Sequence, residues 1–288
     1  MKGGKTKMTI MQELKNKTIL ITGGAGSIGG AITKKLLQYP VRSVRVLDID
    51  EHALFRLKRE VNDKRVRYLL GSVLDKQRIE MAGLKADIII HTAAVKNIEI
   101  SEFNPIQTIE TNITGTVNMI NMCMTNKPKK FLNISTDKAA DATTLYGTTK
   151  NIGEKLTSWA GSHVSPTKFA SARFGNVIET RGNVFEVWNE ENKEGRPLSI
   201  TDPNMKRYFF NIEQAVNFVL ECLLEIKNGE IFIPKMKLFK VVELANKISK
   251  NHKIIGIRKG EKINEILMNS EEKDRSIEKK NMWIIKQI

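Results

Sequence analysis

Three glycines spaced three residues apart join an apolar run to an amphipathic stretch near the start of the chain. The apolar run, residues 18–22, is short and rich in β-branched side chains, which predicts a buried strand. The periodic stretch at residues 28–37 predicts a helix, and Gly23, Gly26 and Gly29 lie at the junction. A glycine turn between a strand and a helix is typical of the first unit of a parallel α/β sheet.

The alternation of apolar runs and helical stretches continues through most of the first 175 residues. Residues 44–47, 66–70, 87–90, 131–135 and 168–174 read as strands, and residues 51–61, 75–81, 104–125 and 146–159 as helices. Nearly continuous apolar strands imply a sheet that is covered on both faces and therefore parallel. We expect an α/β fold with a Rossmann-like doubly wound parallel sheet.

The regular pattern weakens after residue 175. Residues 176–207 contain several turn signals, and a helical stretch at 212–226, a returning strand at 230–233 and a helix at 241–248 follow. The tail from Ser270 is charged and poorly patterned. We expect residues 1–175 and the returning segment 208–235 to form the larger domain. Residues 176–207 and 236–288 would form a smaller, interlocked C-terminal substrate lobe.

The charge of the chain lies mostly near its ends. There are 47 basic and 32 acidic residues, a formal charge of +15, but residues 18–234 hold 28 basic against 24 acidic side chains. No basic cluster is interleaved with aromatic residues, so we expect no nucleic-acid partner. A role at a polyanion or membrane surface is the alternative explanation of the excess charge. A positive surface would also attract diphosphate ligands.

Several classes of protein are excluded by what the sequence lacks. No apolar run approaches the ~18 residues of a membrane span, and the first seven residues form no apolar signal core. We therefore expect a cytoplasmic protein with no transmembrane segment. Two cysteines and four scattered histidines predict neither a disulfide framework nor a metal site.

The glycine turn has the spacing of a dinucleotide cradle. Gly23 permits a tight turn, Gly26 lets the backbone approach a pyrophosphate, and Gly29 lets helix and strand pack closely. Asp48 follows Gly29 by 19 residues at the end of the second expected strand, where an acid accepts hydrogen bonds from a ribose 2′-hydroxyl. The pattern predicts NAD as cofactor. NADP is the alternative, with Arg45 as the nearest cation, and Asp48 could instead cap the helix near residue 51.

A tyrosine and a lysine four residues apart open the expected helix at residues 146–159. Tyr146 and Lys150 project from one face of that helix. A phenol titrates near pH 10, so a base at neutral pH needs a shift of about three units, or roughly 4 kcal/mol. A neighbouring ammonium and a nicotinamide charge can supply it. The alternative is an ordinary surface tyrosine and lysine.

These motifs and seven further segments resemble the extended short-chain dehydrogenases/reductases. Within them the chain is most similar to the soluble UDP-N-acetylglucosamine 4,6-dehydratases of the flagellin-glycosylation and capsule type. The segments are residues 91–96, 104–105, 135–140, 173–177, 201–209, 229–232 and 254–262. The resemblance implies NAD(P)-dependent loss of water from a UDP-hexosamine to a UDP-4-keto-6-deoxy sugar, with C5 inversion in some relatives. It also implies a homo-oligomer, a dimer or hexamer.

The resemblance assigns roles to the catalytic candidates. Tyr146, assisted by Lys150, would deprotonate the C4 hydroxyl, with Thr136 near the C4 oxygen. Lys138 would be the base at C5 and Asp137 the acid at C6, which requires a neutral amine and a protonated carboxyl. An ion pair between Asp137 and Lys138 that merely braces the loop is the alternative. The cofactor would contact Gly23, Gly26, Ser27, Ile28, Gly29, Asp48, Ala93, Ala94, Tyr146 and Lys150.

Guanidinium groups suit phosphate oxygens, so four arginines are candidates for the UDP diphosphate. The resemblance favours one of them, Arg258, together with Asn176, and places Glu261 near the uridine ribose and Lys96 near the sugar. The full set of expected substrate contacts is Lys96, Arg173, Asn176, Arg181, Arg207, Arg258 and Glu261. For each arginine, a surface salt bridge is the alternative.

The chain also departs from the family pattern. Asp141-Ala142 stands where the family has Asn-Pro, Lys259 replaces a proline, and Asn264 replaces a histidine. These changes bear on the sugar more than on the reaction type. Two other functions share the fold: a UDP-sugar 4-epimerase, which needs no second acid–base pair, and a non-catalytic nucleotide-sensing or scaffold protein.

Overall fold

The computed structural model describes residues 9–258 and 260–286, so that Lys259 lies outside the described residues. A nine-stranded sheet runs through the molecule in the order β13-β14-β10-β6-β5-β4-β1-β2-β3. The seven strands from β10 to β3 are parallel, which confirms the expected doubly wound sheet. These seven are β1 (Thr18–Thr22), β2 (Ser43–Asp48), β3 (Val66–Leu70), β4 (Ile88–His91), β5 (Lys130–Thr136), β6 (Lys168–Phe174) and β10 (Glu230–Pro234).

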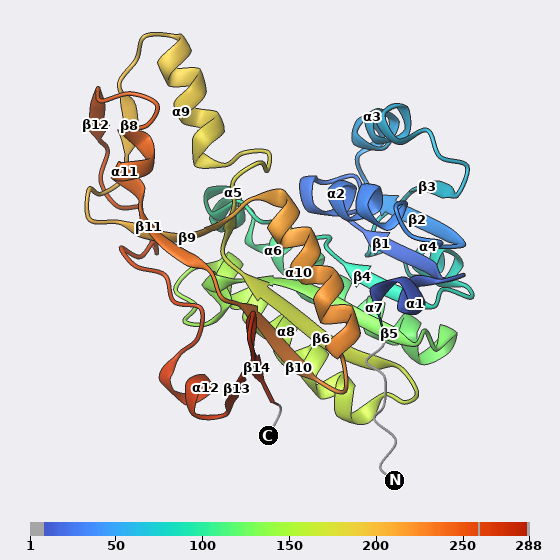
Figure 1. Ribbon diagram of the computed structural model, residues 1–288. Helices are drawn as coiled ribbons and strands as arrows, with labels where there is room; N and C mark the ends of the chain where they lie inside the picture. The colour runs from blue at the N-terminus through green and yellow to red at the C-terminus, as the bar shows by residue number, and fades with distance from the viewer. Residues whose placement is uncertain (1–8, 259, 287–288) are drawn as a thin grey trace.

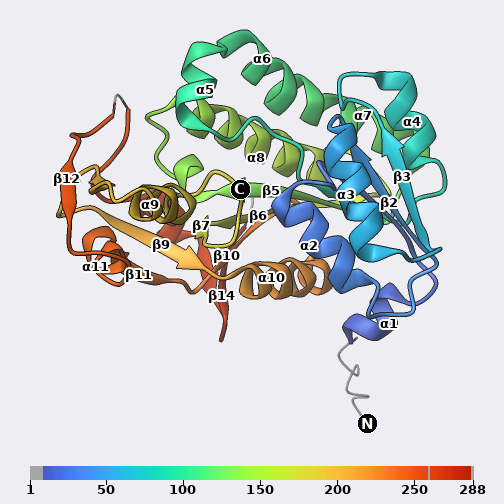
Figure 2. The same ribbon diagram turned by 90° about the horizontal axis from the view of Figure 1, so that it is seen from above.

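Helices cover both faces of this sheet, as Figure 2 shows. One face carries α1 (Ile10–Leu14), α2 (Ser27–Leu36), α3 (Glu51–Val61) and α10 (Ile212–Glu225). The other carries α4 (Lys76–Gly83), α7 (Gly115–Asn126) and α8 (Leu145–His163). Successive strand residues alternate between these two cores: Ile19 and Ile21 pack into the first, Leu20 into the second. Burial on both faces explains why the strand sequences are almost wholly apolar.

The single helix expected at residues 104–125 is interrupted. After α5 (Ile98–Phe103), helix α6 (Pro105–Ile109) passes through a π-helical turn at Glu110–Thr114 into α7. Asn112 lies in that turn, and its side-chain amide both accepts from the backbone nitrogen of Val95 and donates to its carbonyl, at 2.8 and 2.9 Å. The pairing of buried Asn112 with the loop at Val95 can therefore offset the interruption of the regular α-helical hydrogen bonds. The spacing of apolar residues in the sequence does not reveal this interruption.

The smaller lobe, drawn at the upper left of Figure 1, has its own core. It contains the three-stranded sheet β11-β9-β7, the pair β12-β8 and two helices. Trp188, Ile200 and Phe209 are buried at its centre. Its elements are β7 (Asn176–Val177), α9 (Val184–Lys193), β8 (Leu198–Ile200), β9 (Lys206–Phe210), β11 (Lys237–Lys240), α11 (Val241–Ala245) and β12 (His252–Ile254).

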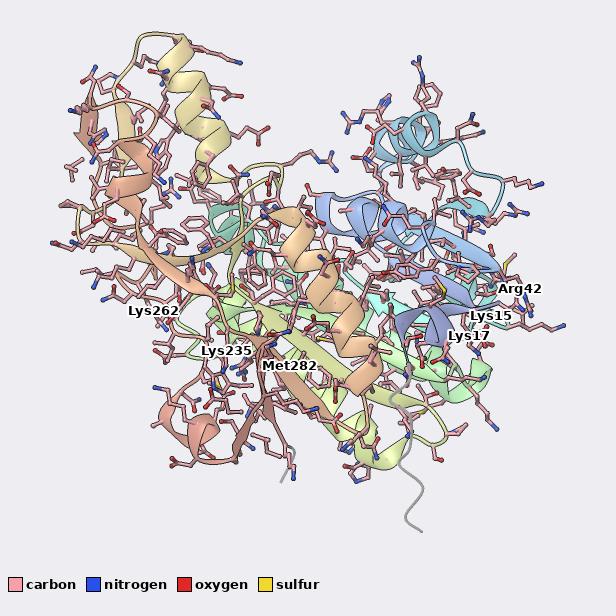
Figure 3. All side chains as sticks on the ribbon, in the orientation of Figure 1. Lys15, Lys17, Arg42, Lys235, Lys262 and Met282 are labelled. Atoms are coloured by element: carbon pink, nitrogen blue, oxygen red, sulfur yellow. The ribbon has the colours of Figure 1, made fainter. Side chains whose placement is uncertain are left out.

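The charged tail is more ordered than its sequence suggests. It forms α12 (Ser270–Asp274), β13 (Ser276–Glu278) and β14 (Met282–Ile285), and β14 pairs antiparallel with β10. Figure 3 shows Lys235 and Met282 close together, and the backbone nitrogen of Lys235 donates to the carbonyl of Asn281 at 3.0 Å. The end of the tail thus joins the sheet of the larger domain, and the lobe boundary expected at residues 236–288 is wrong for these two strands. The buried side chains of β14, among them Met282 and Ile284, pack into the main core.

Basic side chains gather at the start of the first strands. Figure 3 places Lys15, Lys17 and Arg42 on the side of the molecule away from Lys262, and the backbone nitrogen of Arg42 donates to the carbonyl of Lys17. Both residues directly precede strands, whereas the glycine turn follows the opposite, carboxyl end of β1. Among the described residues, no helix has the length and apolar character that a bilayer crossing requires.

Candidate active site

The glycine turn follows the carboxyl end of β1 and lies against the residues after β4. Gly23 has φ +62°, and a Cβ there would lie 2.7 Å from the backbone of Ala93. A Cβ on Gly29 would lie 2.5 Å from the carbonyl oxygen of Gly23. Only glycine fits either position, so the turn stays narrow and brings Ala93 and the adjacent Ala94 beside it.

The helix that follows this turn begins without the side-chain cap that most of the long helices have. Gly26 is the N-cap of α2 and offers no side-chain hydrogen bond, so the first backbone N–H groups have no side-chain acceptor at that position. In contrast, side chains of Asp50, Asp75 and Thr144 cap α3, α4 and α8. An uncapped N-terminus beside a glycine turn fits a phosphate group, and Ser27 and Ile28 are its first residues.

Asp48 lies at the end of β2 and faces the same turn. Its Oδ2 atom accepts from the backbone nitrogen of Ala25 at 2.9 Å, and its Oδ1 atom accepts from that of Asp50 at 3.1 Å. Asp50, and not Asp48, caps α3, so the alternative role for Asp48 as that cap is wrong. Arg45 points elsewhere: its guanidinium donates to the carbonyls of Ala82 and Leu84 at 2.7 and 2.6 Å.

Two of the expected substrate-binding cations lie over the glycine turn. The backbone nitrogen of Arg181 donates to the hydroxyl of Ser27 at 3.0 Å, and its guanidinium donates to the carbonyl of Ala25 at 3.3 Å. Lys96 donates to the carbonyl of Arg181 at 2.8 Å, and burial, followed by repulsion from Arg181, lowers the pKa of its ammonium. The segment after β7 thus brings Arg181 to the start of α2, and Lys96, from the segment after β4, lies against Arg181.

The acid–base candidates come together at the carboxyl end of β5. Thr136 ends the strand, and Asp137 and Lys138 form a single 3₁₀ turn that packs against the start of α8. The Nζ atom of Lys138 lies 3.1 Å from Oδ1 of Asp137, and the Thr136 hydroxyl donates to the same oxygen at 3.0 Å. The other carboxylate oxygen of Asp137 is buried without a hydrogen-bond partner in the described structure. This oxygen faces Gly175, where an added Cβ would come within 3.2 Å of it.

Tyr146 belongs to the same cluster. Burial raises the pKa of the Tyr146 phenol, while the charge of Lys138 and a hydrogen bond with Thr136 oppose that rise. Burial lowers the pKa of Lys138, but Asp137, a further carboxylate and Tyr146 outweigh burial, so the net direction is upward. Lys138 and Asp137 thus form an ion pair, the arrangement that the sequence left open as an alternative.

Lys150 lies one turn after Tyr146 and is 5% exposed. Burial lowers the pKa of Lys150 to about 8, although Glu154 opposes the shift. Burial, with a smaller contribution from Lys150, lowers the pKa of His91 to about 3. The neutral His91 ring lies between the hydroxyls of Thr22 and Thr116, at 2.7 and 3.2 Å, and links the end of β1 to α7.

Arg173 does not lie where a ligand phosphate would meet it. Its side chain is fully buried, and its guanidinium donates to Glu154 at 2.6 and 2.9 Å and to Glu272 at 2.7 and 2.8 Å. A further donor contacts the carbonyl of Leu267 at 3.0 Å. With its donors so engaged, Arg173 ties α12 to the catalytic helix α8, which corrects its expected contact with the diphosphate.

The remaining expected substrate residues are spread over the smaller lobe. Arg207 is 6% exposed and donates to the carbonyls of Lys262 and Ile263 at 2.6 and 2.8 Å, so it holds a backbone segment instead of facing a ligand. Its Nη2 atom lies 3.4 Å from Glu261, whose second oxygen is buried and unpartnered in the described structure. Asn176 donates to the carbonyl of Tyr208, and the exposed Arg258 pairs with Glu99 at 2.9 Å.

Sequence reasoning missed three carboxylates around the catalytic helix: Glu154, Glu265 and Glu272. Glu154 follows Lys150 by four residues, so helical spacing alone places it on the same face. Glu265 lies in an irregular segment, 3.9 Å from Lys138, and no local signal marks it. Glu272 belongs to the capping box of its own short helix, and that pattern does not predict its contact with Arg173.

Comparisons with known proteins show which family the chain resembles. The chain is 40% identical to the inverting UDP-N-acetylglucosamine 4,6-dehydratase of Campylobacter jejuni, with 93% of this chain and 82% of that protein covered. It is 41% identical to an uncharacterized membrane protein of Methanocaldococcus jannaschii, with 94% and 86% covered. The solved structure of Pen from Bacillus thuringiensis superimposes with a TM-score of 0.90 at 33% identity, covering 95% of this chain and 89% of that one.

The family described as polysaccharide biosynthesis protein matches residues 19–287, from the first strand to the last. That span includes the glycine turn, the acid–base cluster and the segment that carries Glu265. The chain therefore belongs to the polysaccharide biosynthesis protein family, among the relatives of the UDP-N-acetylglucosamine 4,6-dehydratases.

Proposed function

We propose that this protein is an NAD-dependent 4,6-dehydratase of a UDP-hexosamine, with UDP-N-acetylglucosamine as the substrate. The reaction would give a UDP-4-keto-6-deoxy sugar for glycan biosynthesis. The observation that carries the proposal is the meeting of Tyr146 with the pair Asp137 and Lys138 at one strand end. Removal of water across C5 and C6 needs a base and an acid in addition to the tyrosine, and this pair can supply both.

The residues around the glycine turn fit a dinucleotide. The narrow turn at Gly23 and Gly29, the uncapped start of α2 and the carboxylate of Asp48 match the pyrophosphate and ribose groups in kind. Arg45 is occupied by backbone carbonyls, which favours NAD over NADP. Held by these residues, NAD would supply the hydride acceptor for C4 of the sugar and, once reduced, the hydride donor for C6.

Side chains of the protein would then remove and donate the protons of the reaction. Tyr146 removes the proton of the C4 hydroxyl, and the buried Lys150 ammonium stabilises the phenolate charge. The ketone formed at C4 acidifies H5, which Lys138 removes while Asp137 protonates the C6 hydroxyl as it leaves. Thr136 orients Asp137 through their 3.0 Å hydrogen bond. Each of these proton transfers would use a side chain of the group formed by Asp137, Lys138 and Tyr146.

For the nucleotide, Lys96 and Arg181 are the cations best placed to meet a diphosphate. They lie together over the start of α2, whereas Arg207 and Arg173 are buried and engaged with protein groups. Asn176, Glu261 and Arg258 stay predicted contacts of the uridine part. A cytoplasmic location and a homo-oligomeric state also belong to the proposal as predictions.

A UDP-sugar 4-epimerase is the second candidate, since it would use the same fold, cofactor and tyrosine. An epimerase returns the hydride to C4 and has no need of an acid–base pair for C5 and C6. The retained Asp137 and Lys138 therefore favour dehydration. A non-catalytic scaffold is disfavoured because Tyr146 and Lys150 keep their places on α8.

Incubation with UDP-N-acetylglucosamine and NAD, followed by mass spectrometry, tests the proposal. We expect a product lighter by one water, with no net consumption of cofactor. A product of unchanged mass would establish epimerisation instead, and bound cofactor without any product would establish the scaffold. Lys138→Ala should bind NAD as the wild type does yet lose water formation by about 10²-fold or more. If that variant dehydrates normally, Lys138 is not the C5 base.

A further inference from the structure

A third ionisable side chain completes the cluster from the opposite end of the chain. Glu265 is 6% exposed, and its Oε1 atom lies 3.9 Å from the Nζ atom of Lys138. Within the described part of the chain, no hydrogen-bond donor satisfies the Glu265 carboxylate. A carboxylate that is buried without a donor and close to one ammonium acts mainly through its charge.

The backbone on both sides of Glu265 is held by hydrogen bonds, and this keeps the Glu265 carboxylate close to Lys138. On the preceding side, Arg207 donates to the carbonyl of Ile263, and Asn264 forms an isolated bridge with Lys206 of β9. On the following side, Arg173 donates to the carbonyl of Leu267. Two buried arginines therefore hold the segment that carries Glu265.

Four charged groups face Glu265 from the elements packed around it. Asp137 and Lys138 approach from the 3₁₀ turn, Arg207 from β9, and Lys262 from the same segment. Burial raises the pKa of Glu265, Asp137 acts in the same direction, and the three cations oppose it. In return, Glu265 is one of the carboxylates that raise the pKa of Lys138.

We infer that Glu265 is a positioning residue for the dehydration step: its negative charge retains the one proton that Asp137 and Lys138 share. The inference rests on the proposed function. It assigns to the C-terminal segment a role in the chemistry itself, in addition to the nucleotide contacts expected of the lobe.

Dehydration requires that the pair of Asp137 and Lys138 keeps its shared proton. In the resting pair Lys138 is an ammonium and Asp137 a carboxylate, 3.1 Å apart. Transfer of one proton from Nζ to the carboxylate gives a neutral amine and a carboxylic acid, with the total charge unchanged. The amine takes H5 as the C5–C6 double bond forms, and the acid gives its proton to the C6 oxygen as the C–O bond breaks. Water leaves, and the resting ion pair is restored.

A pair that has lost this proton to solvent can still remove H5 but cannot protonate the leaving oxygen. The nearby charge of Glu265 raises the proton affinity of both partners, because it attracts the ammonium and repels the carboxylate of Asp137. Removing that charge should let the pair lose its proton at a lower pH. The Glu265 carboxylate itself exchanges no proton with the substrate.

The test compares Glu265→Gln with the wild type over a range of pH. We expect the alkaline limb of the kcat profile to move to lower pH, and kcat on that limb to fall by about tenfold or more, with KM little changed. Glu265→Asp keeps the negative charge, so its kcat at alkaline pH should be close to that of the wild type. Glu271→Gln, an exposed carboxylate of the same segment, is the matched control and should leave the profile unchanged.

A second measurement needs no turnover. Titration of ¹³C-labelled lysine by NMR follows Lys138 directly, with its signal assigned by its absence in Lys138→Gln. The pKa of Lys138 should be lower in Glu265→Gln than in the wild type and unchanged in Glu271→Gln. An unchanged pKa in Glu265→Gln overturns the inference, as does a loss of kcat that is equal at every pH.

The two proposals fail in distinguishable ways. If the wild type removes no water from a UDP-sugar while the pKa of Lys138 falls in Glu265→Gln, the proposed function is wrong and the charge relation holds. If the wild type is a dehydratase and Glu265→Gln leaves both the profile and the pKa in place, Glu265 has no role in retaining the proton.

Discussion

The glycine turn at residues 23–29 and the C-terminal segment at residues 260–272 build two parts of the site by different physical means. In the glycine turn, function depends on backbone shape, because side chains are absent where the chain must approach itself or a phosphate. In the C-terminal segment, irregular backbone is held by buried cations, Arg173 and Arg207, which engage its carbonyls and carboxylates.

This difference predicts how each region fails. A backbone turn of glycines should be sensitive to any added side-chain atom and insensitive to charge. A segment held by ion pairs should tolerate changes of shape at its surface but not the loss of one buried partner. Helix α8 is joined to the C-terminal segment, since it carries the Glu154 that binds Arg173, which in turn binds Glu272.

The largest expected effect is that of Arg173→Met. This change leaves the carboxylates of Glu154 and Glu272 buried without their cation, so the free energy of unfolding should fall by about 3–5 kcal/mol. Denaturant unfolding measures it. Lys34→Met, which breaks an exposed pair with Glu60 of similar length, is the control and should change stability by less than about 1 kcal/mol. Equal effects of the two changes would contradict the assigned importance of the buried clamp.

Next in size is Gly29→Ala. The new Cβ would meet the backbone of Gly23 and Gly24 at 2.5 and 2.6 Å, and no flexible side chain can give way. Distortion of the turn by about 3 kcal/mol corresponds to roughly a hundredfold loss of NAD affinity, measured by calorimetry. Gly30→Ala is the matched control, because its Cβ would meet Leu57 at 3.5 Å and the carbonyl oxygen of Gly24 at 3.9 Å, both ordinary contact distances. Similar NAD affinities in the two variants would show that the turn does not carry the binding.

A smaller effect is expected from the titration of Lys150, the residue of α8 nearest the cofactor side. Its pKa is about 8 in the folded protein against an ordinary value of 10.5. Between these values the unfolded chain holds a proton that the folded protein has released, so folding becomes more favourable as pH rises. Relative to Lys150→Met, the wild type should gain about 2–3 kcal/mol in unfolding free energy between pH 7.5 and 10. A difference that is constant over this range would mean that Lys150 is not desolvated.

The parts of the fold that could be predicted are those whose signal is local. The parallel strands, the helix after the glycine turn and the pairing of Tyr146 with Lys150 on one helix face all follow from periodicity within a few residues. The π-turn around Asn112 was not predictable, because it depends on a bond with Val95, far along the chain. Strand β14 of the charged tail was missed because its apolar side chains are buried only where it pairs with β10.

The candidate site also has features that the sequence predicts and features that only the structure shows. The types of residue at positions 136–138 and 146 indicate acid–base chemistry, but they do not say that Lys138 rests as an ammonium paired with Asp137. Arginines, likewise, look alike in a sequence: Arg181 lies over the glycine turn and Arg173 is fully buried in a clamp. Which of the two can reach a ligand depends on what surrounds each guanidinium.

By itself, then, the sequence determined the doubly wound sheet, the glycine turn and the placing of Tyr146 and Lys150 on one helix, since each depends on side chains close together along the chain. Only the tertiary structure decided that Glu265 joins Lys138 and that Arg173 joins Glu154 to Glu272. Charges and buried hydrogen bonds act over a few ångströms of space, and the chain brings Glu272 to Arg173 from 99 residues away and Glu265 to Lys138 from farther still.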